Sequence, residues 1–222
     1  MDSPETIFTQ GKNSARRTIF MGQPSVAAYT LSQDLLGSYD ANVDLRYSHW
    51  FNSVKNVGGV WLKYSVLTAS PASEVSSEFL LRLPEVYLNK AEALIMLGRT
   101  EEAIDVLRTL REKRLAAETT DVIPTSQEDL VQFVRLERRL ELCGEGHRWF
   151  DLRRYAVHPT FPEEKEIIHE SVKNGTKIGY YRLAPYSENS NNWVWPIPED
   201  AVIFNDGALV ANERDGAPLV EY

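Results

Sequence analysis

Apolar residues recur at spacings of three and four throughout residues 79–157, and no helical period lasts elsewhere in the chain. Such spacing places them on one face of an α-helix. Pro84 suits the first turn of a helix that Gly98 ends. Thr100 can cap a second helix, whose first turn is acidic, as the helix dipole favours. These residues therefore predict a tight hairpin of two helices.

A third helix is predicted after residue 125. Ser126 and Asp129, three residues apart, have the arrangement of a capping pair. The helix that follows has an apolar stripe, which we expect to be buried. That stripe consists of Leu130, Phe133, Leu136, Leu140 and Cys143.

The segments on either side of the helices have no lasting period. Residues 1–78 mix aromatic residues with Gly and Pro, and we expect only short helices there, around Val26–Tyr39. Six prolines exclude long helices from residues 158–222, where Lys177–Leu183 is expected to be a strand and Glu163–Val172 a short helix. The sequence therefore predicts a mainly α fold, in which irregular, loop-rich segments pack against helical hairpins.

The charge balance and the cysteine count exclude several classes of protein and site. Lys and Arg number 24 against 32 Asp and Glu, for a net charge of −8, whereas binding to a nucleic-acid backbone needs a basic face. We therefore expect no nucleic-acid partner. The single cysteine, Cys143, excludes an intrachain disulfide and a multi-cysteine zinc site.

No apolar run is long enough for a membrane span, and the first residues lack the basic and apolar regions of a signal peptide.

The predicted hairpin has some of the spacing of a tetratricopeptide repeat. Tyr87, Gly98 and Ala103 match part of that 34-residue pattern, although several consensus positions are missing. An ordinary pair of antiparallel helices explains the same residues equally well. Because one repeat cannot bury its own face, partner helices must come from elsewhere.

Residues 137–154 form the most strongly charged stretch of the chain. Gly144 and Gly146 within it predict a kink or a close backbone contact, since each glycine costs a helix about 1 kcal/mol relative to alanine. His147 continues the apolar stripe beyond Cys143, together with Phe150, so we expect a packed imidazole. Three oppositely charged pairs are three residues apart and would face one another on a helix: Arg138/Glu141, Glu145/Arg148 and Asp151/Arg154.

The same stretch raises two other possibilities. Glu137, Glu141 and Glu145 have a spacing that would suit a pair of glycosidase carboxylates. However, the general acid of a glycosidase needs a raised pKa, and the adjacent arginines lower it. A metal site at His147 and Asp151 would lack a convincing third ligand. We therefore favour a structural network of ion pairs, with no metal and no catalytic residue.

This charged stretch closely resembles the signature helix of the SusD/RagB family, the nutrient-binding lipoproteins of the Gram-negative outer membrane. Three further segments are similar to family landmarks: residues 36–46, residues 79–93 with Arg82, and Trp195-Pro196-Ile197-Pro198. The residues that match the signature and are expected to be structural are Arg82, Arg138, Glu141, Glu145, His147, Arg148 and Asp151.

Members of the family are usually more than twice this length. The resemblance therefore implies that residues 1–222 are one C-terminal, incomplete SusD-like domain, with parts at 1–78, 79–157 and 158–222. The secretion signal and the lipid-bearing cysteine would then lie upstream, because Cys143 is placed inside a helix.

The resemblance also implies a function. A family member captures oligosaccharides or starch-like polysaccharides at the cell surface, without catalysis and without a cofactor. It delivers them to a SusC-like TonB-dependent outer-membrane transporter, and some relatives take peptides instead.

Aromatic residues interleaved with amides suit sugar binding, because sugars stack their C–H faces on rings. The candidate ligand-binding residues are Trp50, Trp61, Tyr47, Tyr64, Asn52 and Trp193. Trp195 is assigned to packing, and Arg46 and Arg82 to buried ion pairs. Two rival functions stay open, namely a tetratricopeptide-type scaffold that binds protein segments and a glycoside hydrolase.

Overall fold

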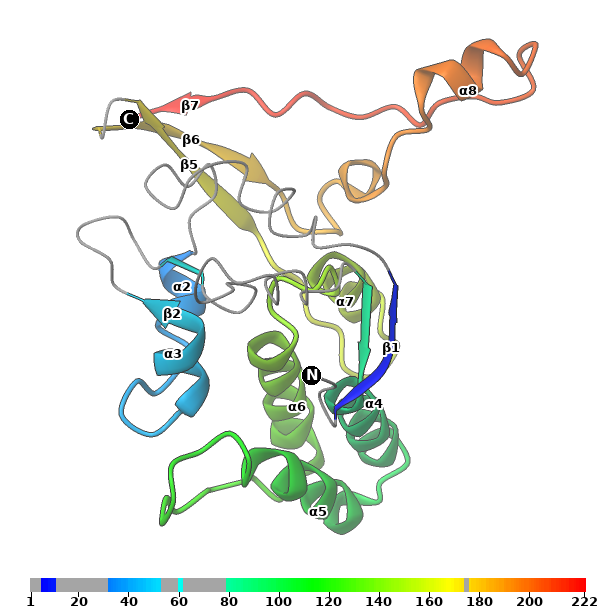
Figure 1. Cartoon of the computed structure of the whole chain (residues 1–222). Coiled ribbons are helices and arrows are strands. Elements are labelled where there is room, and N and C mark those ends of the chain that lie inside the picture. The colour runs from blue at the N-terminus through cyan, green and yellow to red at the C-terminus, as the bar shows by residue number, and fades with distance from the viewer. Residues whose placement is uncertain (1–4, 11–31, 53–59, 62–78, 174–175) are drawn as a thin grey trace. The chain divides into compact units, whose positions relative to one another are not determined.

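The structure is a computed structural model that describes residues 5–10, 32–52, 60–61, 79–173 and 176–222 (Figure 1). The chain divides into two compact units, Met1–Gly146 and His147–Tyr222. The described part is mainly helical, which confirms the expected fold class. The expectation of a single domain over residues 1–222 stays a prediction.

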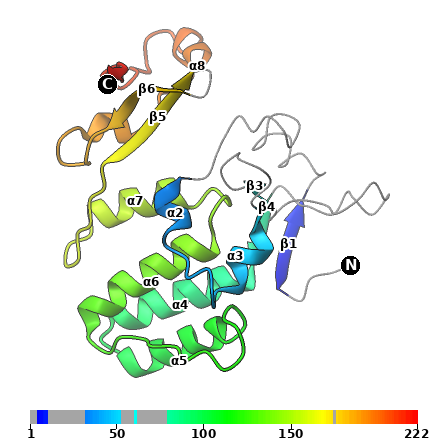
Figure 2. The ribbon, with the colours of Figure 1, turned by 90° about the vertical axis from the view of Figure 1, so that its left-hand side faces the viewer.

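Three helices form the framework of the first unit: α4 (Leu83–Met96), α5 (Thr100–Arg111) and α6 (Gln127–Glu141). In Figures 1 and 2, α4 lies beside α6, and α5 packs against α4. Pro84 lies in the first turn of α4, and Gly98, with a φ of 72°, forms the turn to α5. The predicted hairpin is therefore confirmed. The predicted cap is wrong, because Arg99 is the N-cap of α5 and Thr100 is its first residue.

Helix α6 begins as its capping pair predicts. The Ser126 side chain accepts a hydrogen bond from the Asp129 backbone N–H at 3.2 Å. The apolar stripe is only partly buried, since Phe133 is half-buried and Leu136 is 41% exposed. Helix α6 also buries four charged side chains, those of Arg135, Glu137, Arg138 and Glu141.

The charged stretch is two helices, not one. Helix α6 ends at Glu141, and α7 (Arg148–Ala156) begins after a turn. Gly144 and Gly146 lie in this turn with φ values of 73° and 86°, a left-handed conformation that glycine adopts without strain. The prediction of a kink within one helix is therefore wrong, because the two glycines lie in a turn that separates α6 from α7. The predicted continuation of the apolar stripe from Cys143 to Phe150 is also wrong, because Phe150 is exposed.

Short elements complete the first unit. Strands β1 (Thr6–Gln10) and β4 (Phe79–Arg82) pair antiparallel, so the helical segment begins four residues later than residue 79. Helix α2 (Gln33–Leu36) falls within the expected region of short helices, and α3 (Leu45–Trp50) follows it. Strand β2 (Phe51–Asn52) pairs with β3 (Val60–Trp61).

The second unit contains α7 and a three-stranded antiparallel sheet in the order β5-β6-β7. Strand β6 (Thr176–Leu183) confirms the predicted strand. The predicted helix at 163–172 is wrong, because β5 (Ile167–Lys173) pairs with β6 along that segment. Its Ile-Ile pair favours a strand over a helix. Strand β7 (Val220–Glu221) lies so close to Gly179 that a Cβ there would be 2.2 Å from the Val220 carbonyl oxygen.

The rest of the second unit is a short 3₁₀ helix, η2 (Ser190–Trp193), and α8 (Glu199–Ile203). Among the described residues, no helix is both long and apolar enough to cross a membrane.

Candidate functional site

A buried carboxylate surrounded by three arginines lies at the centre of the first unit. Glu141 is fully buried and accepts hydrogen bonds from Arg46 at 3.1 Å, Arg82 at 3.0 Å and Arg114 at 2.9 Å. Burial alone would raise the pKa of Glu141, but the hydrogen bonds and charge of Arg114, with the charges of Arg46 and Arg82, lower it to about 2. Glu141 is therefore ionised at neutral pH.

A second buried carboxylate, that of Glu137, extends this network. Arg46 Nη1 donates to Glu137 Oε1 at 2.6 Å, and Arg111 contacts the other oxygen. Arg111 also makes a two-point ion pair with Asp121, with Nε–Oδ2 and Nη2–Oδ1 distances of 2.8 Å each. Its guanidinium carbon lies 4.9 Å from the centroid of the Phe133 ring. Arg111 thus joins the end of α5 to α6 and to the loop between them.

The segment before the helices is attached to the network by Arg46. Asp44 caps α3 by accepting the Arg46 backbone N–H at 2.9 Å, and its carboxylate binds the Arg46 guanidinium at 2.8 and 3.0 Å. Burial would lower the pKa of Arg46, but the charge of Glu137 and the hydrogen bonds to Asp44 raise it. Arg46, expected in a buried ion pair, is 2% exposed.

The signature residues of the first unit have partners far away in the sequence. Arg82 makes a two-point ion pair with Glu145, with distances of 2.7 and 3.0 Å. Arg138 donates to the Asn89 side chain at 2.7 Å. The prediction that Glu145 would face Arg148 on one helix is wrong, because the glycine turn separates them.

In the second unit, the remaining signature residues belong to α7. Asp151 is buried and accepts from Arg154 at 2.9 Å, as the spacing of three predicts. His147 is the N-cap of α7, where its side chain makes no capping hydrogen bond, and it is half-buried like Arg148.

Two of the candidate ligand-binding residues, Tyr47 and Trp50, lie on α3. Both are half-buried and pack against a small core that consists of Tyr39, Phe51, Leu140 and Cys143. The Tyr39 hydroxyl donates to the Leu140 carbonyl oxygen at 2.7 Å and so holds this core on α6. Tyr47 and Trp50 therefore contribute to packing while part of each side chain stays accessible.

The other candidates from the first 78 residues are described only in part. The β2–β3 register pairs Asn52 with Val60 and Phe51 with Trp61. The side chains of Asn52 and Trp61, and the whole of Tyr64, lie outside the described residues.

Two tryptophans of the second unit, Trp193 and Trp195, have the reverse of their expected exposure. Trp193, a candidate ligand contact, is 2% exposed, and its indole N–H donates to the Ala184 carbonyl oxygen at 2.8 Å. It stacks on Trp149 with ring centroids 5.2 Å apart. Trp195, assigned to packing, is 68% exposed and meets Trp149 edge-on at 5.9 Å. Burial of Trp193 favours a packing role, while Trp195 presents an accessible ring.

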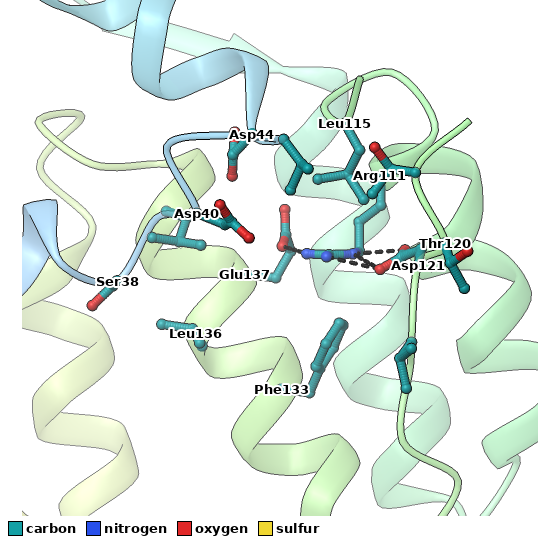
Figure 3. A pocket seen from close by; sticks show the side chains of 14 residues that line it. Ser38, Asp40, Asp44, Arg111, Leu115, Thr120, Asp121, Phe133, Leu136 and Glu137 are labelled. Atoms are coloured by element: carbon teal, nitrogen blue, oxygen red, sulfur yellow. Dashed lines mark hydrogen bonds and ion pairs between the residues drawn. The ribbon is translucent and has the colours of Figure 1, made fainter. Parts of the chain in front are cut away.

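A cavity of about 290 Å³ lies over α6 in the first unit (Figure 3). One wall is the loop of residues 38–44, and the opposite wall is formed by the end of α5 and residues 115–122. Phe133, Leu136, Glu137 and Leu140 of α6 line its base. No spacing in the sequence predicts this cavity, because its two walls come from segments that are far apart along the chain, residues 38–44 and residues 111–122.

The described residues contain no cluster of three or more His, Cys, Asp or Glu side chains that could hold a metal ion.

Comparisons with known proteins identify the family. The model of the SusD family matches residues 5–214. A curated relative, SusD-like protein P38 of Formosa agariphila, is 39% identical over an alignment 98 residues long that covers 41% of this chain and 20% of that protein.

Two solved structures share the fold. A SusD superfamily protein of Bacteroides thetaiotaomicron has a TM-score of 0.54 at 21% identity, over 89% of this chain and 42% of that one. A SusD-like carbohydrate binding protein of Bacteroides vulgatus has a TM-score of 0.59 at 18% identity, over 91% of this chain and 48% of that one. The chain thus spans less than half the length of these relatives. Its match to the family model extends over nearly all of its residues, and the chain belongs to the SusD/RagB family.

Proposed function

We propose that this chain is part of a non-catalytic protein that binds glycans, such as oligosaccharides or starch-like polysaccharides, at the outer-membrane surface. The observation that carries the proposal is the match to the SusD family over residues 5–214. A solved relative that shares the fold is described as a carbohydrate binding protein, which supports the same ligand class.

The chemistry of the charged helix favours binding over hydrolysis. A glycosidase needs one carboxyl group that is protonated at working pH. Glu141, with a pKa of about 2 and three arginine partners, holds no proton at neutral pH. Glu137 is enclosed by Arg46 and Arg111. Both carboxylates therefore suit structural ion pairs.

Accessible aromatic rings are the natural contacts for the flat faces of sugars. Trp50 and Tyr47 keep part of their surface accessible on α3, and Trp195 is the most exposed tryptophan ring in the described part of the chain. We propose these three as ligand contacts, together with Asn52, Trp61 and Tyr64. Trp193 stacks on Trp149, which contacts Trp195, and would support the Trp195 ring through Trp149.

The family membership also supports a proposal for the cellular location and the partner of the complete protein. We propose that the complete protein is a surface lipoprotein of the outer membrane, and that it passes glycans to a SusC-like TonB-dependent transporter. Co-purification of the complete protein with that transporter from outer membranes tests this part of the proposal. Recovery of the protein without any transporter would contradict it.

Affinity electrophoresis of the folded chain in gels that contain different polysaccharides tests the ligand class. We expect retarded migration in at least one gel and no release of reducing sugar from that polysaccharide. Release of reducing sugar would favour a hydrolase. Unretarded migration in every gel would overturn glycan binding and leave the scaffold function.

A further inference from the structure

We propose that the cavity over α6 binds a single uncharged sugar unit and that its acidic lining excludes acidic sugars. The proposal rests on the proposed glycan binding and adds a position and a ligand class to it. Four carboxylates and one guanidinium line the cavity (Figure 3). They are those of Asp40, Asp44, Asp121, Glu137 and Arg111.

The size and the apolar surface of the cavity suit one sugar ring. Its volume of about 290 Å³ lies at the lower end of the range for small-molecule pockets, roughly 300–1,000 Å³. Aliphatic side chains occur on each side, including Val43, Leu115 and Leu136. Leu136 is 41% exposed although it belongs to the apolar stripe of α6. Such side chains can cover the C–H face of a ring, and the carboxylates can accept hydrogen bonds from its hydroxyl groups.

The carboxylates that line the cavity differ in whether they already have an arginine partner. Asp121 and Glu137 bind Arg111, and Asp44 binds Arg46. Asp40 is exposed, accepts one hydrogen bond from the Asn42 backbone N–H at 3.0 Å, and has no cationic partner among the described residues. In Figure 3, Asp40 comes from the loop of residues 38–44 and Glu137 from α6. Asp40 is thus the carboxylate with most capacity for a new hydrogen-bond donor.

The charge around the cavity determines which sugars fit. Among the described residues that line the cavity, Arg111 is the single cation, and two carboxylates already share it. A uronate or sulfate group would therefore face the Asp40 carboxylate, which has no cationic partner among the described residues, and like charges at close range repel. A neutral sugar meets no such repulsion.

Ion pairs within the chain hold the walls of the cavity in place. Arg111 connects Glu137 of α6 to Asp121 of the facing loop, and Arg46 fixes Asp44 on the opposite side. A site whose groups are fixed in advance loses less free energy to ordering when it binds. The ion-pair network thus serves as the frame of the cavity.

Saturation-transfer NMR of the full chain with methyl glycosides tests the proposal. We expect signals from methyl glucoside, methyl galactoside or methyl mannoside, and none from methyl glucuronide.

Leu136→Trp fills the cavity and should weaken binding about tenfold or more. Leu97→Trp, a matched change at an exposed residue outside the cavity, should leave binding unchanged. Asp40→Asn removes the unneutralised charge and should let methyl glucuronide bind, whereas Asp105→Asn, outside the cavity, should not.

The outcomes separate the cavity from the general function. Equal signals from Leu136→Trp and the parent chain, or equal binding of the glucuronide and neutral glycosides, would overturn the cavity site. If polysaccharide gels still retard the chain in that case, the proposed function survives. If the folded chain responds to no glycoside and no polysaccharide gel retards it, both proposals fail.

Discussion

Arg46 donates a hydrogen bond of 2.6 Å to Glu137, a residue 91 positions further along the chain. The same nitrogen also contacts Glu141, one helical turn away. Because Arg46 lies on α3 and both glutamates belong to α6, this guanidinium holds the segment of residues 32–52 on the helical framework, together with the hydrogen bond from the Tyr39 hydroxyl to Leu140. The position of the aromatic residues on α3 depends on it.

Replacement of Glu141 by alanine should lower the stability of the chain. The change leaves three guanidinium groups without their shared carboxylate, and loss of one partner in a buried ion pair costs about 3–5 kcal/mol. Arg138→Ala should also lower stability, since it removes the hydrogen bond to Asn89 at 2.7 Å and the ion pair with Glu85 at 3.8 Å. Urea unfolding measures both changes.

The control for these variants is Asp105→Ala. This residue pairs with Arg108 on the exposed face of α5, so its loss should change the unfolding midpoint little. If Glu141→Ala unfolds like the parent chain and yet has lost all glycan binding, the structural role of the network is refuted.

The stability of the chain should fall as the pH is lowered from about 5 towards 2. The folded pKa of Glu141 is about 2 against 4.5 for the unfolded chain, so the unfolded state binds more protons in this window. The contribution of Glu141 is complete above pH 4.5 and is lost as the pH falls through the folded pKa. A shift of this size corresponds to about 3 kcal/mol.

The contribution of Glu141 can be isolated with Glu141→Gln, which cannot titrate. Unfolding free energies of the parent and the variant, measured at pH 7 and pH 3, should converge towards low pH. Parallel pH profiles would show that this carboxylate is not held ionised by its arginines.

The two tryptophans of the C-terminal segment should respond oppositely to truncation. Trp193→Ala removes a buried ring and its hydrogen bond to Ala184, which should cost about 3–5 kcal/mol. Trp195→Ala removes an exposed ring and should leave the melting temperature nearly unchanged. Trp50 is half-buried, so Trp50→Ala should lower the melting temperature by an intermediate amount. A large drop in melting temperature for Trp195→Ala would remove it from the proposed ligand contacts.

Gly146→Ala should destabilise the turn between α6 and α7. A Cβ at this residue would meet no atom within 4 Å, so the cost comes from the φ of 86° alone. A left-handed conformation costs a residue with a side chain about 1–2 kcal/mol. Gly216→Ala, with equally open surroundings and no such φ, is the matched control. Equal stability of the two variants in thermal melts would contradict this explanation.

Local patterns in the sequence predicted the helical framework well. The spacing of apolar residues located α4, α5 and α6, and Ser126 with Asp129 marked the start of α6. Both signals depend only on residues a few positions apart. The prediction of β5 as a helix failed because its strand conformation depends on pairing with β6.

Long-range contacts explain what the sequence could not predict. The Glu145/Arg148 pair was expected on a helix that continues past Glu141, whereas α6 ends there and Gly144 and Gly146 form a turn with positive φ values. The partners of Glu141 come from segments 27 to 95 residues away. For the same reason, neighbouring tryptophans with similar sequence surroundings, Trp193 and Trp195, could not be distinguished by exposure.

The most direct test of glycan binding by this chain is a calorimetric titration of the folded 222-residue protein with the oligosaccharide that affinity electrophoresis selects. Because the chain spans less than half of its solved relatives, we expect part of the binding surface to be missing. The predicted result is saturable binding with a Kd weaker than about 1 μM, without any release of reducing sugar. Binding at or below that Kd would contradict a divided surface, and the absence of saturable binding to any glycan would contradict glycan binding itself.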